Sequence, residues 1–162
     1  MEDKRHRRQA YALRESMMQM ESPLVLVADD HADIRRLVAT ALRKDGWSVV
    51  ELADGAELVE HVGSALLFGN LRGELDPVAL VVSDIRMPGP DGLQILAELR
   101  RAEIAVGFIL MTAHADAEVR AEAERLGADA FIAKPFEIDD LRALVRSVLT
   151  TSGILPAADM VS

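Results

Sequence analysis

The sequence predicts a single α/β domain of three layers, in which helices cover both faces of a parallel five-stranded sheet. Three observations support this fold class. Short apolar runs alternate with segments whose apolar residues recur every three or four positions, the pattern of strands alternating with amphipathic helices. The apolar runs are continuous, as in strands buried on both faces of a parallel sheet. Several runs also end abruptly in a polar or charged residue, which marks the change from buried strand to loop.

The boundaries of the expected elements are marked by residues that suit the ends of helices. Gly46 follows the first helical stripe at the position of a C-terminal cap, and Asp54 suits the N-cap of the next helix. The Gly, Asn and Pro residues of 68–77 indicate a long loop, either an inert insertion or an added contact surface. The expected elements are strand 24–28, helix 33–45, strand 47–52, helix 55–67, strand 78–83, helix 92–102, strand 106–111, helix 116–126, strand 130–133 and helix 138–150.

This alternation places one domain at 23–150, flanked by an N-terminal extension at 1–22 and a C-terminal tail at 151–162. The extension contains a basic cluster at 4–8. Three interpretations of it remain open: a solvated tail, a short helix that docks on a partner or a second copy, and an arm that binds nucleic acid, which is the least favoured. The helical interpretation rests on apolar residues at helical spacing, namely Ala10, Leu13, Met17 and Met20.

The composition excludes several classes of function. The chain has 18 basic and 27 acidic residues, a net charge of −9, and this acidity argues against direct binding of nucleic acid. It has no cysteine, which excludes disulfides, thiolate nucleophiles and zinc–cysteine sites. Neither a secretory signal nor an apolar run long enough to span a membrane is evident, so we expect a cytoplasmic protein without membrane contact.

Five polar residues follow the ends of four expected strands: Asp29, Asp30, Asp84, Thr112 and Lys134. Because ligands bind at the carboxyl ends of strands in open parallel sheets, these side chains are expected to converge. Two carboxylates about 4 Å apart repel each other by on the order of 4 kcal/mol at an effective dielectric near 20, a cost that a divalent cation would offset. Oxygen ligands with room for water suit Mg²⁺.

A cation, a lysine and a hydroxyl around one carboxylate are the parts of a phosphoryl-transfer site. The positive charges neutralise charge on the transferring oxygens. Asp84 stands alone at the end of its strand and is the candidate nucleophile, because carboxylates can form aspartyl-phosphates.

With these residues in this order, the chain resembles the receiver domain of two-component response regulators, of the single-domain chemotaxis-receiver type. The resemblance covers about residues 23–150 and implies a flavodoxin-like fold with strand order 2-1-3-4-5. It rests on four motifs in this order: Asp29-Asp30, the run from Asp84 to Gly92, Thr112-Ala113 and Lys134-Pro135-Phe136.

The resemblance implies a role for each residue of the metal site. Asp84 would be the phosphoacceptor and a ligand of Mg²⁺. Asp30 would bind the cation directly and Asp29 through water, and the backbone carbonyl of Arg86 would be a further ligand.

The resemblance also implies the phosphoryl-binding and switch residues. Lys134, Thr112 and the backbone N–H of Ala113 would bind the phosphoryl group, with a cis peptide bond between Lys134 and Pro135. Thr112 and Phe131 would form the switch, although the family often has Tyr where this chain has Phe, so a hydroxyl is missing.

The function that follows is a phosphorylation-dependent signalling switch. It would accept a phosphoryl group from a histidine kinase or a histidine phosphotransfer protein and change its affinity for a protein partner through the 116–150 face. Its only catalysis would be its own phosphotransfer and autodephosphorylation, and it would be a monomer or weak dimer.

Three alternatives remain. One is a receiver-like binding module that is not phosphorylated. Another is an aspartate-based phosphatase, disfavoured because such enzymes usually carry a second acid where this chain has Arg86. The third is a fragment of a longer regulator, although Met1 and the patternless tail lead us to expect a complete short chain.

Overall fold

The structure is a computed structural model that describes residues 23–72 and 78–153, apart from the side chains of 64–72. Five strands and five helices alternate, and all strand pairs are parallel in the order β2-β1-β3-β4-β5, as predicted. The helix expected near residues 10–20 lies outside the described residues. The elements are β1 (Leu24–Ala28), α2 (Ala32–Lys44), β2 (Ser48–Leu52), α3 (Gly55–Arg72), β3 (Val78–Asp84), α4 (Gly92–Arg101), β4 (Gly107–Thr112), α5 (Ala117–Arg125), β5 (Ala130–Ala133) and α6 (Ile138–Thr151).

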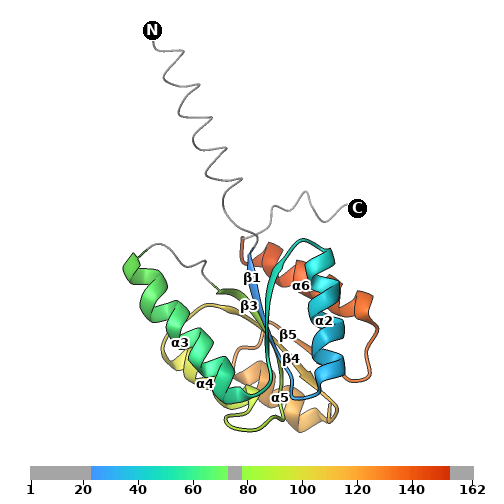
Figure 1. Cartoon of the computed structure of the whole chain (residues 1–162). Coiled ribbons are helices and arrows are strands. Elements are labelled where there is room, and N and C mark those ends of the chain that lie inside the picture. Colours follow the sequence, from blue (N-terminus) through green and yellow to red (C-terminus); the bar gives the residue numbers. More distant parts are fainter. Residues whose placement is uncertain (1–22, 73–77, 154–162) are drawn as a thin grey trace.

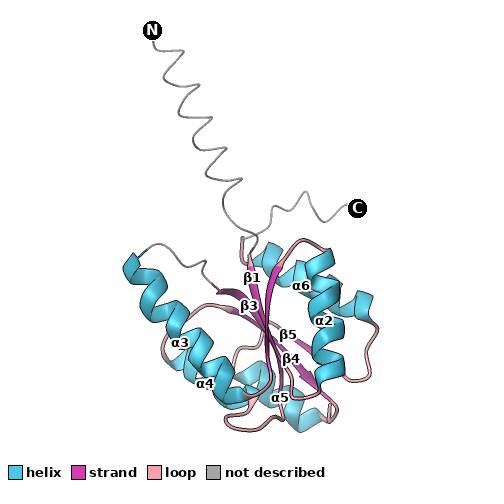
Figure 2. Ribbon diagram, viewed as in Figure 1, coloured by secondary structure: helices cyan, strands magenta, loops and turns pink. Residues whose placement is uncertain are grey.

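The sheet lies between two layers of helices (Figures 1 and 2). Along each central strand, successive side chains enter opposite cores, as the two-residue period of a strand requires. In β1, Val25 and Val27 pack in the core beneath α2 and α6, whereas Leu26 and Ala28 pack in the core beneath α3, α4 and α5. Since both faces are covered, the central strands read as continuous apolar runs.

One predicted boundary is wrong by more than a single residue. Residues 68–72, expected to begin the long loop, form the last part of α3. Gly69 and Asn70 suggested a break, but one glycine inside a helix costs only about 1 kcal/mol relative to alanine. The good helix formers on either side offset that cost. Of the expected loop, 73–77 lie outside the described residues.

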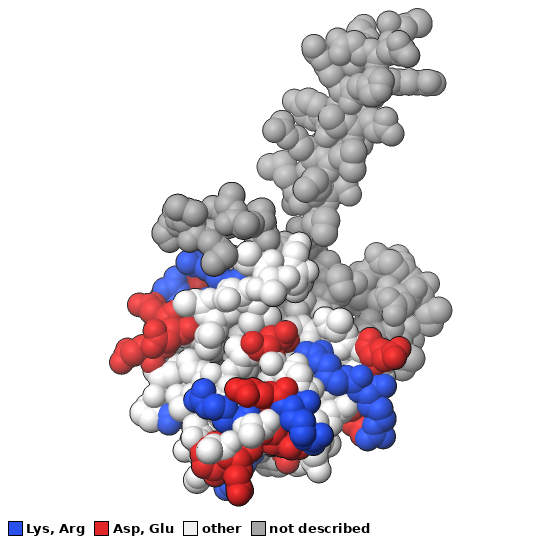
Figure 3. Space-filling model, turned by 180° about the vertical axis from the view of Figure 1, so that it is seen from behind, with Lys and Arg blue, Asp and Glu red and all other residues white. Residues whose placement is uncertain are grey.

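Within the described ranges, no helix combines the length and the apolar character needed to cross a bilayer. On the face shown in Figure 3, Lys and Arg side chains lie beside Asp and Glu side chains, and the described residues of that face form no single basic patch.

A buried carboxylate joins the first and last helices. Asp45, directly after α2, accepts a hydrogen bond from Arg142 Nε of α6 at 2.8 Å and a second from Arg142 Nη2. The Asp45 side chain is almost fully buried, and Arg146 adds a more distant positive charge. The hydrogen bonds from Arg142 lower the pKa of Asp45 from its ordinary value of 3.8, against the effect of burial.

This pair predicts a pH-dependent loss of stability in Asp45→Ala. At pH 7 the variant should lose about 2 kcal/mol of unfolding free energy, as for hydrogen bonds to charged groups. Because the folded-state pKa lies below 3.8, the stabilisation is complete above 3.8 and disappears as the pH falls through the folded-state value. Urea unfolding from pH 7 downward measures this, with Glu122→Gln in an exposed ion pair as the near-neutral control. A difference from wild type that does not shrink at acid pH would contradict the assignment.

Candidate functional site

The register of the sheet brings the predicted site residues to one edge. Ala28 pairs with Ser83, Asp84 with Met111, and Thr112 with Ala133. The next residues along β1 and β5, Asp29 and Lys134, therefore meet Asp84 at the carboxyl ends of the strands. The sequence predicted this convergence.

Lys134 lies between two buried carboxylates. Its Nζ is 2.6 Å from Asp29 Oδ2 and 3.3 Å from Asp84 Oδ2. The side chain of Lys134 is 9% exposed and that of Asp29 is 0% exposed. The backbone N–H of Lys134 donates to the Thr112 carbonyl at 2.8 Å, and the Lys134–Pro135 peptide bond is cis, as predicted.

The pKa of the Asp84 carboxyl is raised above its ordinary value, and burial is the largest cause. The nearby charge of Asp29 raises it further, whereas Lys134 lowers it without offsetting burial. The ionised form of Asp84 is therefore costly at this position, and a second positive charge would stabilise it.

The acidic end of the site fits a divalent cation. Asp29, Asp30, His31 and Asp84 each place one donor atom within 4.8 Å of the others. The three carboxylates supply the oxygen ligands that Mg²⁺ prefers, and the partial exposure of Asp30 leaves space for water ligands. These residues would hold the cation. Which of them bind it directly stays a prediction, as does the carbonyl of Arg86.

One residue of this cluster, His31, was not among the residues predicted from the sequence, where no function was assigned to it. Nδ1 of His31 lies 3.3 Å from Asp29 Oδ1 and 3.2 Å from Asp30 Oδ1. The sequence could have indicated His31, because it directly follows Asp29 and Asp30 and therefore lies close to the same strand end.

The loop after β3 is held by its own hydrogen bonds and by α3. The N–H of Gly92 donates to the Ile85 carbonyl and the N–H of Gly55 donates to the Pro88 carbonyl, both at 2.9 Å. Asp91 and Gln94 form a capping box that starts α4. These contacts fix the backbone on either side of Arg86, which is exposed at the site.

The phosphoryl-binding candidates surround an open hollow of about 380 Å³ beside Asp84. Thr112 Oγ1 accepts a hydrogen bond from the N–H of His114 at 3.0 Å. Thr112 is buried, whereas Ala113 and His114 are exposed at the mouth of the hollow. The lining thus contains Asp84, Thr112, Ala113 and Lys134 together, as the motifs predicted.

The predicted switch aromatic, Phe131, is half-buried on β5. The guanidinium carbon of Arg120, on α5, lies 5.0 Å from the centre of its ring. This cation–π contact joins the ring to α5, a helix of the expected partner face. A Tyr at position 131 would also offer a hydroxyl to a partner, which Phe131 lacks. The switch role of Phe131 stays a prediction.

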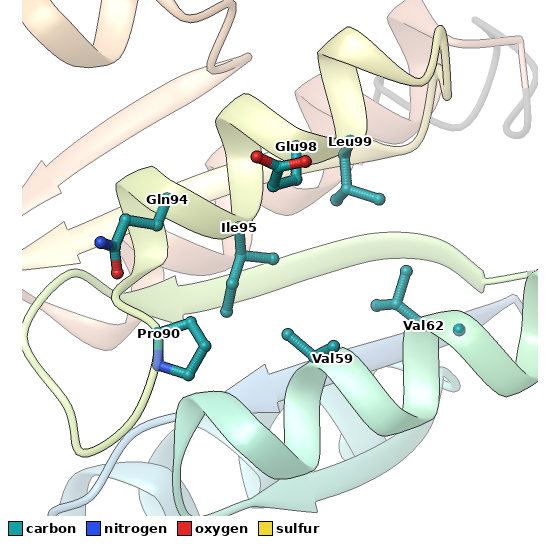
Figure 4. A pocket seen from close by; sticks show the side chains of 8 residues that line it. Val59, Val62, Pro90, Gln94, Ile95, Glu98 and Leu99 are labelled. Carbon is teal, nitrogen blue, oxygen red and sulfur yellow. The ribbon is translucent and has the colours of Figure 1, made fainter.

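A second hollow, of about 570 Å³, lies between α3 and α4. Figure 4 shows Val59 and Val62 of α3 facing Ile95 and Leu99 of α4 across it, with Glu98 at its rim. Although larger, it is mostly apolar, and none of the predicted site residues lines it. The chemistry therefore favours the smaller hollow as the functional site.

Comparisons with known proteins agree with this fold. Residues 25–146 match the family model described as the response regulator receiver domain. The chain is 29% identical over 130 residues to sporulation initiation phosphotransferase F of Bacillus subtilis, covering 80% of this chain and 96% of that protein. It is 33% identical over 131 residues to the DNA-binding transcriptional regulator NtrC of Escherichia coli, covering 81% of this chain. The match spans about a quarter, 26%, of that regulator's length.

Among solved structures, the chain resembles response regulator protein TrrA of Thermotoga maritima, solved in complex with Mg(2+)-BeF. The TM-score is 0.64 and the identity 28%, over 78% of this chain and 99% of that one. The family model covers most of the chain, and the fold and strand order agree with it. The chain therefore belongs to the response regulator receiver domain family.

Proposed function

We propose that this chain is a phosphorylation-dependent switch in which Asp84 accepts a phosphoryl group and thereby changes the affinity of the domain for a protein partner. One observation carries the proposal. A buried carboxylate, Asp84, lies 3.3 Å from the ammonium of Lys134 and opens onto a hollow that Thr112 and Ala113 also line. Burial makes the ionised form of Asp84 costly, and a carboxylate held in such a position is typical of a functional site.

The proposed reaction is attack by a carboxylate oxygen of Asp84 on the phosphorus of a phosphohistidine. An O–P bond forms as the P–N bond breaks, and the imidazole nitrogen leaves with the electron pair and takes up a proton from solvent. The donor would be a histidine kinase or a histidine phosphotransfer protein.

The charges at the site support this transfer. Lys134 would bind an oxygen of the incoming group with its ammonium, and the N–H of Ala113 would donate to another. Asp29, Asp30, Asp84 and the Arg86 carbonyl would hold Mg²⁺, which when bound supplies positive charge that offsets the charge on the transferring oxygens.

Thr112 and Phe131 would carry the signal. The Thr112 hydroxyl would leave its contact with the His114 N–H to donate to a phosphoryl oxygen, and Phe131 would turn inward behind it. Moving such a switch from 1:99 to 99:1 takes about 5.5 kcal/mol of differential stabilisation, and couplings of about 1–3 kcal/mol give a graded response.

The output would be a changed affinity for a protein bound at the 116–150 face, where Arg120 and Phe131 meet. In this proposal the domain itself contacts neither nucleic acid nor membrane, acts in the cytoplasm as a monomer or weak dimer, and catalyses only its own phosphotransfer and autodephosphorylation. Removal of residues 1–20 would leave phosphorylation unchanged.

The test is intact mass after incubation with acetyl phosphate, with and without Mg²⁺. We expect one phosphoryl group on wild type only when Mg²⁺ is present, and none on Asp84→Asn. Asp139→Asn, which removes an exposed acid of α6, is the matched control and should be phosphorylated like wild type. A folded wild type that gains no mass from acetyl phosphate or from a phosphohistidine donor would favour the alternative, a receiver-like module that signals by binding alone.

A further inference from the structure

We propose that His31 is a nitrogen ligand of the divalent-cation site, so that the site binds borderline transition-metal ions such as Ni²⁺ selectively over Mg²⁺. This inference rests on the cation site of the proposed function and adds to it a ligand and a metal preference. The observation behind it is the position of the His31 imidazole against the two acids of that site.

The spacing of the donor atoms fits a shared cation. Two ligand atoms held at about 2.1 Å from one ion and at right angles are about 3 Å apart. Nδ1 of His31 lies 3.3 Å from Asp29 Oδ1 and 3.2 Å from Asp30 Oδ1, close to that separation. A single ion could therefore contact the ring nitrogen and both carboxylates with small side-chain movements.

The local backbone directs the ring to this place. His31 is the N-cap residue of α2, yet its side chain makes no capping hydrogen bond, so the imidazole is not used to satisfy the helix. Its backbone N–H donates to Asp29 Oδ1 at 2.9 Å, which fixes the residue against the acid. The His31 side chain is 68% exposed, so a cation with its water can reach it.

The two carboxylate oxygens of Asp29 have different partners, which leaves one of them facing His31. Oδ2 of Asp29 binds the ammonium of Lys134 at 2.6 Å, whereas Oδ1 faces His31. The oxygen on the His31 side is thus the one available to a cation held at the mouth of the site.

The chemistry of the donors sets the preference. Carboxylate, carbonyl and water oxygens suit Mg²⁺, which binds nitrogen poorly, whereas imidazole suits Ni²⁺ and Zn²⁺. Any carboxylate site binds Ni²⁺ somewhat better than Mg²⁺, so affinity for Ni²⁺ alone proves nothing. The distinguishing quantity is how much of the ratio of the two affinities depends on the His31 ring.

The experiment is calorimetric titration of the untagged full chain with Ni²⁺ alone and with Mg²⁺ alone, for wild type and His31→Ala. We expect the Ni²⁺ affinity to fall at least tenfold in His31→Ala, while the Mg²⁺ affinity changes less than twofold. Excess Mg²⁺ should displace the tightly bound Ni²⁺ from wild type, because both ions need the same carboxylates.

Two histidines serve as controls. His61→Ala changes an exposed histidine on α3 and should leave both affinities as in wild type. His114→Ala changes the other exposed histidine at the hollow, and a tenfold loss there, with none in His31→Ala, would overturn the assignment. Circular dichroism checks that each variant is folded.

The outcomes separate this inference from the function on which it rests. Equal Ni²⁺ affinity in wild type and His31→Ala, with Mg²⁺ bound by both, would overturn the His31 ligand alone and leave an ordinary carboxylate site. Failure of wild type to bind either ion would overturn the cation site itself, and Mg²⁺-dependent phosphorylation would then be absent as well.

Discussion

Lys134→Ala is expected to bind Mg²⁺ about tenfold more tightly than wild type and yet to lose most phosphoryl-dependent switching. In wild type the ammonium lies between Asp29 and Asp84 and repels any cation held by the same acids. A unit charge about 5 Å from a divalent cation contributes on the order of 7 kcal/mol at an effective dielectric near 20. Solvent in the open hollow reduces this, so about tenfold in affinity is the expected gain.

The same substitution should make stability depend on the cation. Without Lys134, two buried carboxylates lose their partner, which typically costs about 3 kcal/mol or more. We therefore expect the variant to remain folded but to lose about that much unfolding free energy in chelator, and to recover most of it in millimolar Mg²⁺. Urea unfolding in both conditions measures the difference.

Switching in Lys134→Ala is measured by backbone hydrogen exchange of the 116–150 face, before and after treatment with acetyl phosphate. The phosphoryl group would have lost the ammonium that binds it, so the response should be weak even where mass shows phosphorylation. Lys44→Ala, an exposed lysine on α2, is the matched control and should behave as wild type. Full switching in Lys134→Ala would refute the role assigned to this residue.

The fold could be predicted because its signals are local and agree with one another. The alternation of Val25 and Val27 with Leu26 and Ala28 between two cores needs only the period of a strand. The C-terminal end of α3 could not be predicted from the sequence in the same way. Gly69 and Asn70 have a weak preference against helix, and the surrounding residues outweighed it.

The candidate site could be predicted for residues that end strands, because topology alone brings Asp29, Asp84 and Lys134 together. The role of neighbouring residues depends on side-chain direction, which sequence does not give. His31 turns toward the acids instead of capping α2, and Arg120 covers the ring of Phe131 across two elements. The contact between Arg120 and Phe131 has no sequence spacing that would indicate it.

Gly55→Ala is expected to destabilise the protein by about 3 kcal/mol or more and to weaken the cation site with it. A Cβ at this position would lie 1.8 Å from the carbonyl oxygen of Pro90 and 2.9 Å from its carbonyl carbon. Both are backbone atoms, so the clash can be relieved only by moving α3 or the loop after β3. Overpacking of a rigid contact commonly costs about 1–3 kcal/mol, and a clash with backbone lies at or beyond the upper end of that range.

The displaced loop is the one that carries Arg86, so the effect should reach the site. The N–H of Gly55 holds this loop through the Pro88 carbonyl at 2.9 Å, a contact that the shift would break. Gly63→Ala, in the same helix, adds a Cβ that meets nothing within 4 Å and should be stabilising by about 0.5–1 kcal/mol through helix propensity. Urea unfolding and Mg²⁺ titration of the two variants give the comparison. If Gly55→Ala unfolded like Gly63→Ala and bound Mg²⁺ like wild type, the close approach of α3 to this loop would not be what positions the Arg86 carbonyl.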